Sequence, residues 1–591
     1  MHQLTPEHLQ AKIDFIRSYS KANNPADASR YDANANVTVA NIATLEAEIN
    51  KDIFIQVNRR LVQDSIRKHF NEDLAKEYLR QIEEHEIYIH DESSIKPYCA
   101  SVTMYPFLLE GLVPLGGESK APKHLSSFCG SFINLVFALS SQIAGAVATP
   151  EFLLYFDYFA RKEYGDDYLT ENTHDINNQL QHVFYAINQP ASARGNQSVF
   201  LNVSVFDNYF MESLFAGFTF PDFQRPNFES LKMLQLFFLN WLNEERLRAV
   251  LTFPVVTAAM LTEHGRPKDR VFAYDCAKSL HEGNSFFIYM SNSVDSLSSC
   301  CRLRNPLTDN TFSSSLGAGG VSTGSVNVIT LNLNRLIQKG KDLAQEVEKV
   351  QKYQVAYRRI IEEFIANDFL PIYTHGFANL NRQFMTIGIN GLAEAAESKG
   401  LTVGNNIAYK MFCVDTLKIL SDSNREARAK YNCMFNLEIV PAESLGVKNA
   451  KWDREDGLEV HRDCYNSYLY LVEDEDTNLL DKILLHSGET LKYLDGGSAV
   501  HLNLEDYFSV QAYLNVFTMA ATVGCNFFGF NVRNTICNDC GHITKKTFNS
   551  CANCGSSNVD WVTRIIGYLK RISSWAAPRI EEHSRRRYHN E

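Results

Sequence analysis

Two pairs of cysteines near the C-terminus have the spacing of a metal site. They are CxxC motifs separated by ten residues, and they comprise Cys537, Cys540, Cys551 and Cys554. Each motif can present two thiolates to one ion from a tight turn, so two motifs complete a tetrahedral shell of four cysteines. Gly541 and Gly555 follow the second cysteine of each pair and ease the turn of the backbone around the metal. Four protein ligands leave no open position, and we therefore predict a structural site.

The spacing also indicates which metal is bound. An iron–sulfur cluster is the alternative that four thiolates allow. Two knuckles around a short polar loop favour Zn²⁺, and the whole pattern is that of a zinc ribbon. Four buried cysteines without a ligand would explain neither the pairing nor the regular spacing.

A glycine lies in an apolar run soon after the second pair. The run is "TRIIGYLKRISSW" at 563–575, and the glycine is Gly567, thirteen residues after Cys554. An isolated glycine in a strand-like run is usually a bulge or a point of close packing. The other interpretation is chemistry that requires a residue without a side chain, held in place by the neighbouring cysteine cluster.

The composition is that of a folded protein with a large core. Of the 591 residues, 45% are hydrophobic, 12% aromatic and 21% charged, which argues against a disordered or fibrous protein. The net charge of −12 opposes general binding to polyanions. Arg585, Arg586 and Arg587 form the only compact basic cluster near a terminus, so any site for a polyanion would be local.

The sequence lacks the signals of export or membrane insertion. The opening "MHQLTPEHLQAKIDF" has no basic segment leading into an apolar one. No stretch approaches the roughly 18 apolar residues that a membrane span needs. Thirteen cysteines in such a chain indicate reduced thiols, used for metal binding or catalysis, and a cytoplasmic location.

The elements that must position these residues alternate between helices and strands. Apolar spacing predicts helices within 40–86, 127–162, 226–250, 341–368, 391–422 and 506–524. Strands are expected at "IYIHD" (87–91), "VNVITLNL" (326–333), "YNSYLYLVED" (465–474), "GGSAVHLNL" (496–504) and "CNFFGFNVRN" (525–534). A Gly- and Ser-rich stretch at 313–325 reads as a loop that enters a buried strand. This order indicates an α/β architecture, and a barrel is more economical than a string of small domains.

The ribbon followed by "RIIGYL" resembles the C-terminus of the anaerobic, class III ribonucleotide reductases, which are glycyl radical enzymes. Further segments resemble that family in the family's order. They are "NANVT" (34–38), "IYIHD" (87–91) with "KPYC" ending at Cys99, "CCRLR" (300–304), "TGSVNVITLNL" (323–333), "IGINGLAEA" (387–395) and "YNSYLYLVED" (465–474). Any one of these matches alone would be weak, whereas the ordered set is specific.

The resemblance implies a fold and a division of the chain. The expected fold is a ten-stranded α/β barrel with an inner finger loop, followed by the zinc ribbon and a glycyl radical loop. The expected parts are an N-terminal appendage (1–33), the catalytic barrel (34–530), the ribbon (531–560) and the radical loop with its tail (561–591). Residues 1–33 are too few for the ATP-cone of some members, so we expect no overall on/off response to dATP through such a domain.

The resemblance also implies roles for the glycine and the cysteines. Gly567 occupies the position that stores an unpaired electron on its α-carbon, where a side chain would crowd the planar radical. Cys301 resembles the thiyl position at the tip of the finger loop, and Cys99 resembles the second cysteine, which helps the ribose 2′ hydroxyl leave. Such an enzyme supplies deoxyribonucleotides for DNA synthesis and takes ribonucleotides, here expected as triphosphates.

Two departures from the formate-dependent members concern the source of electrons. Those members carry an asparagine where this chain has Ser325, and this chain has the vicinal pair Cys300 and Cys301. Both features are more similar to the branch that is reduced by a thioredoxin- or glutaredoxin-like protein. Cys300 is therefore a candidate catalytic residue, with a bystander packed behind the loop as the alternative.

The resemblance further implies partners and cofactors. A radical-SAM activase with an iron–sulfur cluster would install the radical on Gly567, dNTP and ATP effectors would regulate the enzyme, and the chain would form a homodimer. Neither a membrane nor a nucleic acid is expected as a partner. The helix start near Glu443 could hold substrate phosphates, or it could be an ordinary capped helix.

Two competing functions remain at this point. Another glycyl radical enzyme, of the pyruvate formate-lyase type, would share the barrel, the cysteine loop and the glycine, but the ribbon and the separate Cys99 segment disfavour it. A zinc-ribbon nucleic-acid-binding protein would need a basic face, and the ribbon loop supplies only Lys545 and Lys546.

Overall fold

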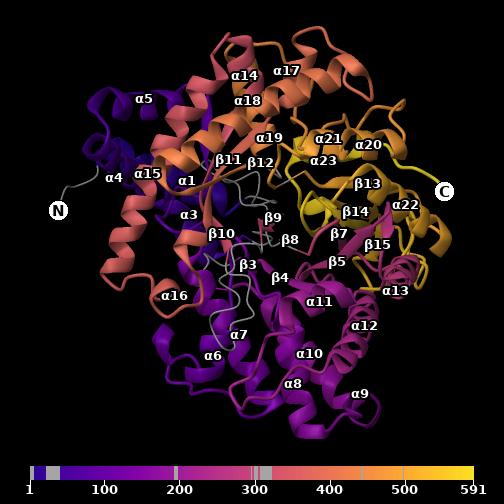
Figure 1. Cartoon of the computed structure of the whole chain (residues 1–591). Coiled ribbons are helices and arrows are strands. Elements are labelled where there is room, and N and C mark those ends of the chain that lie inside the picture. The colour runs from indigo at the N-terminus through magenta and orange to yellow at the C-terminus, as the bar shows by residue number, and fades with distance from the viewer. Residues whose placement is uncertain are drawn as a thin grey trace.

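One large sheet, closed into a barrel, organises the fold (Figure 1). The computed structural model describes residues 5–21, 40–191, 197–294, 323–440, 444–496 and 498–591, with the backbone of two short paired strands, β8 (Ser296–Ser298) and β9 (Arg304–Pro306). Ten strands follow one another in hydrogen-bonded order. They are β12 (Met434–Ile439), β11 (Gln383–Asn390), β10 (Thr323–Asn332), β2 (Cys99–Ser101), β3 (Val147–Ala148), β4 (Leu201–Phe206), β5 (Val255–Glu263), β7 (Phe287–Ser291), β14 (Phe527–Val532) and β13 (Val500–Leu504).

The ten strands form two parallel sets that meet at antiparallel seams. Strands β2, β3, β4, β5 and β7 run parallel to one another, as do β10, β11 and β12. The β2–β10 pair is antiparallel, and so is the β7–β14 pair, with β13 parallel to β14. We refer to these contacts as the β2–β10 seam and the β7–β14 seam.

The two ends of this strand order are joined by the residues that lead into β13. The N–H groups of Asp495 and Gly496 donate to the Leu437 carbonyl of β12 at 3.0 and 3.2 Å. Gly496 also forms a parallel bridge with Glu438, four residues before β13 begins at Val500. The ring of ten strands is therefore complete, which confirms the predicted barrel.

Long helices cover the outside of the barrel (Figure 1). Helix α15 packs on β10 and β11, α18 packs on β12, and α4 lies against α15. The longer helices are α4 (Lys51–His69), α5 (Glu72–Glu83), α7 (Leu125–Gln142), α8 (Phe152–Tyr164), α10 (Thr173–Ile187), α12 (Phe228–Glu245), α13 (Arg270–His281), α15 (Leu343–Ala366), α18 (Ile407–Tyr431), α19 (Leu445–Glu455), α22 (Val510–Val523) and α23 (Ala577–Arg585).

Shorter elements connect these helices and the strands. They are α6 (Tyr105–Glu110), α9 (Tyr168–Glu171), α11 (Asn208–Phe215), α14 (Leu333–Gln338), α16 (Pro371–Thr374), α17 (Leu392–Glu397), α20 (Leu479–Leu485) and α21 (Gly488–Leu491), with strands β1 (Ile87–Ile89), paired to β10, and β6 (Arg266–Pro267), paired to β5. None of the helices in the described part of the chain has both the length and the hydropathy that a membrane crossing requires.

The sequence explains where several helices begin and end. The Asn71 side chain caps α5 by accepting from the Leu74 N–H at 2.8 Å. Ser509 caps α22, which ends at Gly524 with φ +75°, a left-handed conformation that favours glycine. These signals confirm the helices predicted for the N-terminal region and for 506–524.

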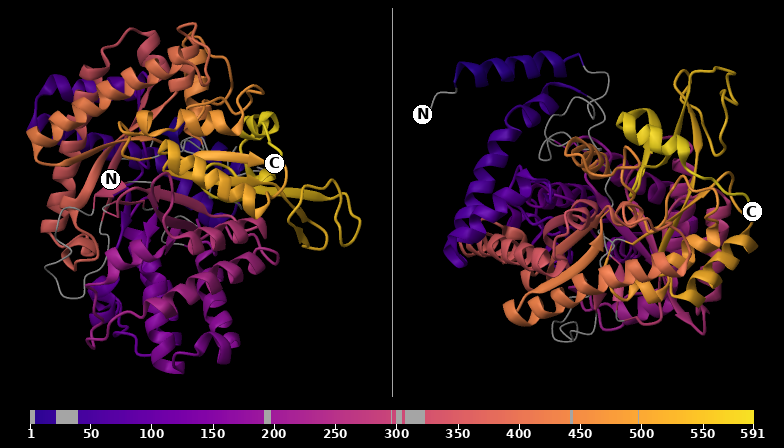
Figure 2. Two further views of the ribbon diagram at one scale, coloured as in Figure 1. Left: turned by 45° about the vertical axis from the view of Figure 1, so that its right-hand side comes forward. Right: turned by 90° about the horizontal axis from the view of Figure 1, so that it is seen from above.

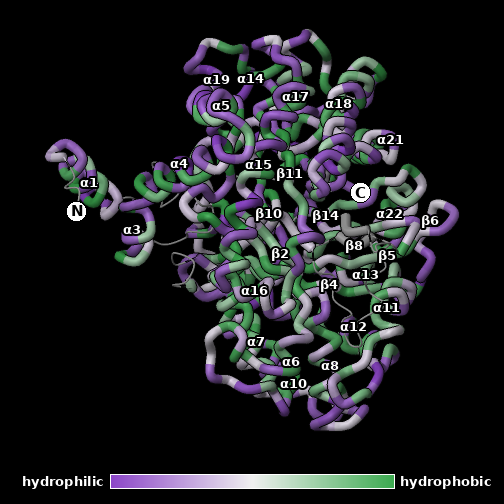
Figure 3. Tube along the Cα trace, turned by 60° about the vertical axis from the view of Figure 1, so that its left-hand side comes forward, coloured by the Kyte–Doolittle hydropathy of each residue, from purple (hydrophilic) through white to green (hydrophobic). Residues whose placement is uncertain are grey.

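The N-terminal helices lie apart from the barrel (Figure 3). Helices α1 (Pro6–Tyr19) and α3 (Ile42–Ile49) project from one side of the molecule. Phe15 and Tyr19 are buried where α1 packs on α3, and Lys12 of α1 forms an ion pair with Asp52. The described part of the predicted appendage is thus a helix held by the start of the barrel domain.

The strand predicted at 465–474 is wrong. The segment consists of bends and turns, although Tyr468 and Tyr470 are buried and stacked with ring centroids 5.0 Å apart. Its backbone donors are used elsewhere: the Tyr465 N–H bonds to the Gly446 carbonyl at 3.0 Å, and the Asn466 N–H to Glu394 Oε1 at 2.9 Å. These two N–H groups are therefore not available to a neighbouring strand.

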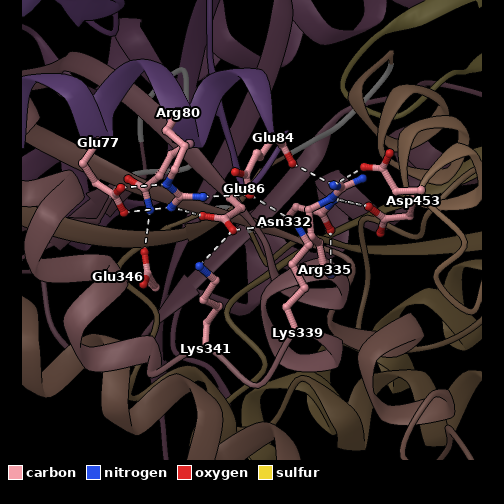
Figure 4. Close-up of polar contacts among 12 residues, drawn as sticks. Glu77, Arg80, Glu84, Glu86, Asn332, Arg335, Lys339, Lys341, Glu346 and Asp453 are labelled. Carbon is pink, nitrogen blue, oxygen red and sulfur yellow. Dashed lines mark hydrogen bonds and ion pairs between the residues drawn. The ribbon is translucent and has the colours of Figure 1, made fainter.

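An ion-pair network holds the far end of β10 (Figure 4). Arg335 of α14 is fully buried and pairs with Asp453 of α19 at 2.8 Å. The buried carboxylate of Glu86, just before β1, pairs with Arg80 at 2.8 Å and with Lys341 at 3.2 Å. Buried charges are costly unless they are compensated, so this network specifies how α5, α14 and α19 meet around β10.

Candidate active site and metal centre

The β2–β10 seam brings two predicted site residues together. Cys99 opens β2 and is the register partner of Ser325 in β10, and both side chains are fully buried. The Ser325 hydroxyl lies 2.6 Å from the Thr386 hydroxyl of β11 and donates to the Asn327 carbonyl at 3.3 Å. Ser325 is therefore fixed between Cys99 on one side and β11 on the other.

A glycine and a bulge shape this seam. Gly324 has φ +151°, and a Cβ there would lie 2.1 Å from the Cys99 carbonyl oxygen, so only glycine allows the two strands to approach this closely. The register between β10 and β11 shifts between Ser325 and Asn327, which is a bulge of the kind that turns a side chain toward a site. Sequence reasoning missed this bulge, although a lone glycine in a strand-like run is one of its signals.

Cys99 is disulfide-bonded in the structure. The other ten described cysteines are free thiols. For this one residue, the expectation of reduced thiols does not hold. Cys300 and Cys301 lie outside the described residues, and so does Glu443.

The six free cysteines outside the metal cluster have the surroundings expected of inert thiols. Five are buried and Cys433 is half-buried. Burial raises the pKa of the Cys525 thiol to about 12 and raises that of Cys276 well above its ordinary value. Thiols that resist ionisation are poor nucleophiles and poor metal ligands.

The four predicted metal ligands converge on one point. Their Sγ atoms all lie within 4.8 Å of one another, with Cys537 and Cys554 separated by 3.7 Å and Cys540 and Cys551 by 3.6 Å. A tetrahedron with Zn–S bonds of about 2.3 Å has edges of about 3.8 Å. The thiols therefore fit Zn²⁺ with little rearrangement.

The backbone of both knuckles is built for a metal. Gly541 donates to the Cys537 carbonyl at 3.0 Å, and Gly555 donates to the Cys551 carbonyl at 2.9 Å. Both glycines have left-handed φ values, +74° and +75°, as the spacing predicted. The hydrogen bond from the His542 N–H lowers the pKa of Cys540 to about 6, which favours the thiolate that binds metal.

The metal cluster and Gly567 belong to one small sheet. Its strand order is β16 (Ile543–Thr544), β15 (Asn534–Cys537), β17 (Val559–Arg564) and β18 (Leu569–Arg571). This sheet projects from the barrel at the C-terminal side (Figure 2). Strands β17 and β18 pair from Arg564↔Leu569 onward, so Gly567 lies in the tight turn that joins them. We call residues 559–571 the glycine hairpin.

The tip of the glycine hairpin packs on the barrel. The Arg564 guanidinium lies over the Phe287 ring of β7 at 4.2 Å, and the Tyr568 ring lies 5.2 Å from Phe200 and 5.8 Å from Phe253. Arg564 also donates through Nη1 to the Gly567 carbonyl at 3.2 Å. Gly567 is thus part of a turn against the β7–β14 seam, not a bulge within a strand.

The lysines of the ribbon loop dock it onto the barrel domain. Lys545 Nζ bonds to the Asn243 side chain and, at 2.9 Å, to the Glu282 carbonyl. Burial lowers the pKa of Lys545 to about 8. Lys546 faces Asp506 at 3.6 Å. Because both lysines are engaged within the chain, they do not form the basic face that a nucleic-acid-binding ribbon would need.

Comparison with known proteins identifies the family. The family model for anaerobic ribonucleoside-triphosphate reductase matches residues 46–589. None of the curated proteins compared with the chain matches it. Among solved structures, an anaerobic ribonucleotide reductase has a TM-score of 0.85 and 26% identity, covering 99% of this chain and 93% of that one.

Two structures from Thermotoga maritima give the same result. The anaerobic ribonucleotide reductase in complex with dATP and CTP has a TM-score of 0.82 at 26% identity, covering 99% of this chain and 100% of that chain. The same enzyme with glycerol in the active site has a TM-score of 0.83 at 28% identity, covering 98% and 95%. These matches favour nucleotide reduction over the pyruvate formate-lyase alternative. The chain belongs to the anaerobic ribonucleoside-triphosphate reductase family, and its reaction is the reduction of ribonucleotides to deoxyribonucleotides.

Proposed function

We propose that the chain carries out this reduction by radical chemistry, with the unpaired electron stored on Gly567. A radical-SAM activase with an iron–sulfur cluster removes one α-hydrogen from Gly567. The glycyl radical takes the hydrogen atom of the Cys301 thiol, and the resulting thiyl takes the 3′ hydrogen of the ribose. Cys99 donates the proton with which the 2′ hydroxyl leaves as water, and its sulfur keeps the electron pair.

The packing of the glycine hairpin on the barrel is the observation that carries this proposal. A residue that carries a radical must lie within contact distance of the residue from which it takes a hydrogen atom, because such transfers need reacting atoms about 3–3.5 Å apart. The tip residues Ile565, Ile566 and Tyr568 are buried against the barrel, whereas a ribbon with a separate role would have no reason to present an apolar tip. The zinc ribbon then serves to hold this hairpin.

We propose that a pair of thiols supplies the two electrons of the reaction by forming a disulfide. Cys99 is one member, and the vicinal pair Cys300 and Cys301 offers the other. A thioredoxin- or glutaredoxin-like protein then reduces the disulfide. Ser325, which stands where members of the formate route carry an asparagine, supports this route.

Further parts of the proposal concern ligands and organisation. We propose Zn²⁺ at the four cysteines, a ribonucleoside triphosphate as substrate, dNTP and ATP as effectors, and a cytoplasmic homodimer. The relatives with dATP in the specificity site and with CTP support the nucleotide assignments. The proposed division is an appendage (1–33), a barrel (34–530), a ribbon (531–560) and the radical loop with its tail (561–591).

The radical assignment is tested by paramagnetic resonance after anaerobic treatment with a radical-SAM activase. The wild type should give an organic radical signal coupled to one α-hydrogen, and Gly567→Ala should give none while keeping its zinc and its melting temperature. Ser573→Ala is a matched control, because its hydroxyl bonds to Asp560 in the same sheet at 2.6 Å but lies outside the turn. An undiminished signal in Gly567→Ala would overturn the assignment.

A further inference from the structure

The chain that follows the glycine hairpin turns back and forms hydrogen bonds with it. Arg586, directly after α23, donates through Nη1 to the Arg564 carbonyl at 3.0 Å and through Nη2 to the Ile565 carbonyl at 2.7 Å. These two carbonyls belong to the last residue of β17 and to the first residue of the turn that contains Gly567. One guanidinium group therefore fixes two successive peptide planes at the entrance to the turn.

The Arg586 side chain is itself rigidly held. Its guanidinium forms a two-point ion pair with Glu582, with Nε to Oε1 and Nη2 to Oε2 both at 3.0 Å, and lies 5.3 Å from the Trp575 ring. Only 2% of the Arg586 side chain and 9% of the Glu582 side chain are exposed. Burial acts to raise the pKa of Glu582, but the charges of Arg586 and Arg579 outweigh it and lower that pKa. The pair therefore stays ionised at neutral pH.

A second guanidinium continues the contact to the glycine. Arg564 accepts from Arg586 through its carbonyl and donates through its own side chain to the Gly567 carbonyl at 3.2 Å. Arg564 is buried, with 2% of its surface exposed, and rests on Phe287 of the barrel. The carbonyls of Arg564, Ile565 and Gly567 are thus all bonded to guanidinium donors.

The tail that carries Arg586 is anchored to the barrel on its other side. The Arg587 N–H donates to the Val472 carbonyl at 2.8 Å. His589 pairs with the end of β13: its N–H donates to the Asn503 carbonyl, and its carbonyl accepts from the Glu505 N–H, both at 3.0 Å. The Glu591 carboxylate accepts from the Ser509 N–H, at the start of α22, at 2.8 Å. All of these contacts are with the barrel domain. Arg586 therefore connects the turn that contains Gly567 to a tail that is fixed on the barrel.

From this chain of contacts we infer that Arg586, held by Glu582, is a positioning residue for Gly567: it sets the place of the turn relative to the barrel during hydrogen-atom transfer. The inference rests on the proposed role of Gly567. A planar guanidinium fork suits this task, because it holds two acceptors at a fixed angle, which a lysine cannot do. A displacement of about 1 Å at a reacting centre can cost on the order of 10²-fold in rate.

The test compares Arg586→Ala, Arg586→Lys and Glu582→Gln with the wild type and with Arg585→Ala. The last variant is a matched control, because Arg585 forms the same i,i+4 ion pair with Glu581 on the exposed side of α23. For each activated protein one measures zinc content, radical per chain, the line shape of the radical signal and ribonucleotide turnover per radical. The line shape reports the coupling to the remaining α-hydrogen and so the local geometry of the backbone at residue 567, which a loss of stability alone would not change.

We expect Arg586→Ala to keep its zinc, to alter the line shape and to lower turnover per radical by at least about tenfold, within the range that misplacement allows. Arg586→Lys should fall between it and the wild type, Glu582→Gln should follow the same direction, and Arg585→Ala should match the wild type. If Arg586→Ala does not fold, Glu582→Gln, which keeps the size of the side chain, decides. Wild-type line shape and turnover per radical in the folded variants would overturn the inference while the role of Gly567 stands. A radical that persists in Gly567→Ala would instead overturn the proposed function.

Discussion

Cys99 and Ser325 stand opposite each other across the antiparallel seam between β2 and β10. The seam is the place where the two parallel halves of the barrel meet, and the glycine hairpin packs at the other such place, against Phe287 of β7. Among the described residues that the family resemblance singles out, Cys99 and Ser325 therefore lie at one seam, and the hairpin that carries Gly567 packs at the other. Seams are positions where strands of opposite direction present their ends together, so residues from distant segments can face one interior.

The setting of Ser325 leads to a prediction about the reductant. A serine has no carboxamide, the group found at this position in formate-dependent members. The Ser325 hydroxyl is also fully buried and bonded to the Thr386 hydroxyl at 2.6 Å. We expect anaerobic turnover when a thioredoxin- or glutaredoxin-like protein is the only reductant, and at least tenfold less with formate alone. Equal or faster turnover with formate would contradict the thiol route.

Removal of one metal ligand should release the metal and then disable the radical site. We expect Cys537→Ser to fall from about one zinc per chain to almost none, because three ligands hold a structural ion poorly. Loss of radical should follow, since Cys537 ends β15, the strand that pairs with β17 of the glycine hairpin. Elemental analysis and the radical signal measure both effects, with Cys525→Ser, a buried free thiol, as the control. A zinc-free variant with a full radical would show that the ribbon has another purpose.

Exposure to air should cut the chain at the radical. Dioxygen adds to a carbon-centred radical, and the backbone then breaks at that residue. Activated protein exposed to air should therefore yield a short C-terminal fragment that begins near residue 567, detected by mass spectrometry. Activated Gly567→Ala, treated identically, should stay intact. Cleavage at another residue would move the radical assignment to that residue.

Local patterns allowed the four-cysteine cluster to be predicted. The two CxxC motifs and the glycines after them are sufficient to predict two knuckles, because all residues of a knuckle are close in sequence. The long helices were equally predictable from their apolar spacing and caps, as for α5 and α22. The identity of Gly567 as a turn residue was less accessible, since the strand pairing that makes it a turn is visible only in the fold.

Most barrel strands could not be predicted, for a physical reason. Strands such as β5 and β11 are buried on both faces, and β11 is buried at every position, so they lack the alternation that marks a half-exposed strand. β2 and β3 have only three and two residues, too few for any periodic signal. Their positions are fixed by neighbours across the barrel, not by local sequence.

The basic cluster at the C-terminus is a second case in which local sequence does not predict the surroundings of a residue. Three successive arginines suggest a solvated basic patch, yet Arg586 is buried between Glu582 and Trp575. The i,i+4 spacing of Glu582 and Arg586 is visible in the sequence and indicates a helical ion pair. The burial of that pair depends on the return of the tail to the glycine hairpin, which no local pattern encodes.

A buried carboxyl group beside β2 should make stability depend on pH. Glu151 accepts from the Met104 N–H at 3.1 Å and from the Thr103 hydroxyl at 3.4 Å, and burial raises its pKa from 4.5 to about 7. The folded protein therefore binds more protons than the unfolded chain between these values, so stability is full below about pH 4.5 and falls as the pH rises to 7, by on the order of 3 kcal/mol. Glu151→Gln, which cannot ionise, should lose this dependence, and its melting temperature relative to the wild type should rise between pH 5 and pH 8. Parallel pH profiles for the two proteins would show that Glu151 is not protonated in the folded state.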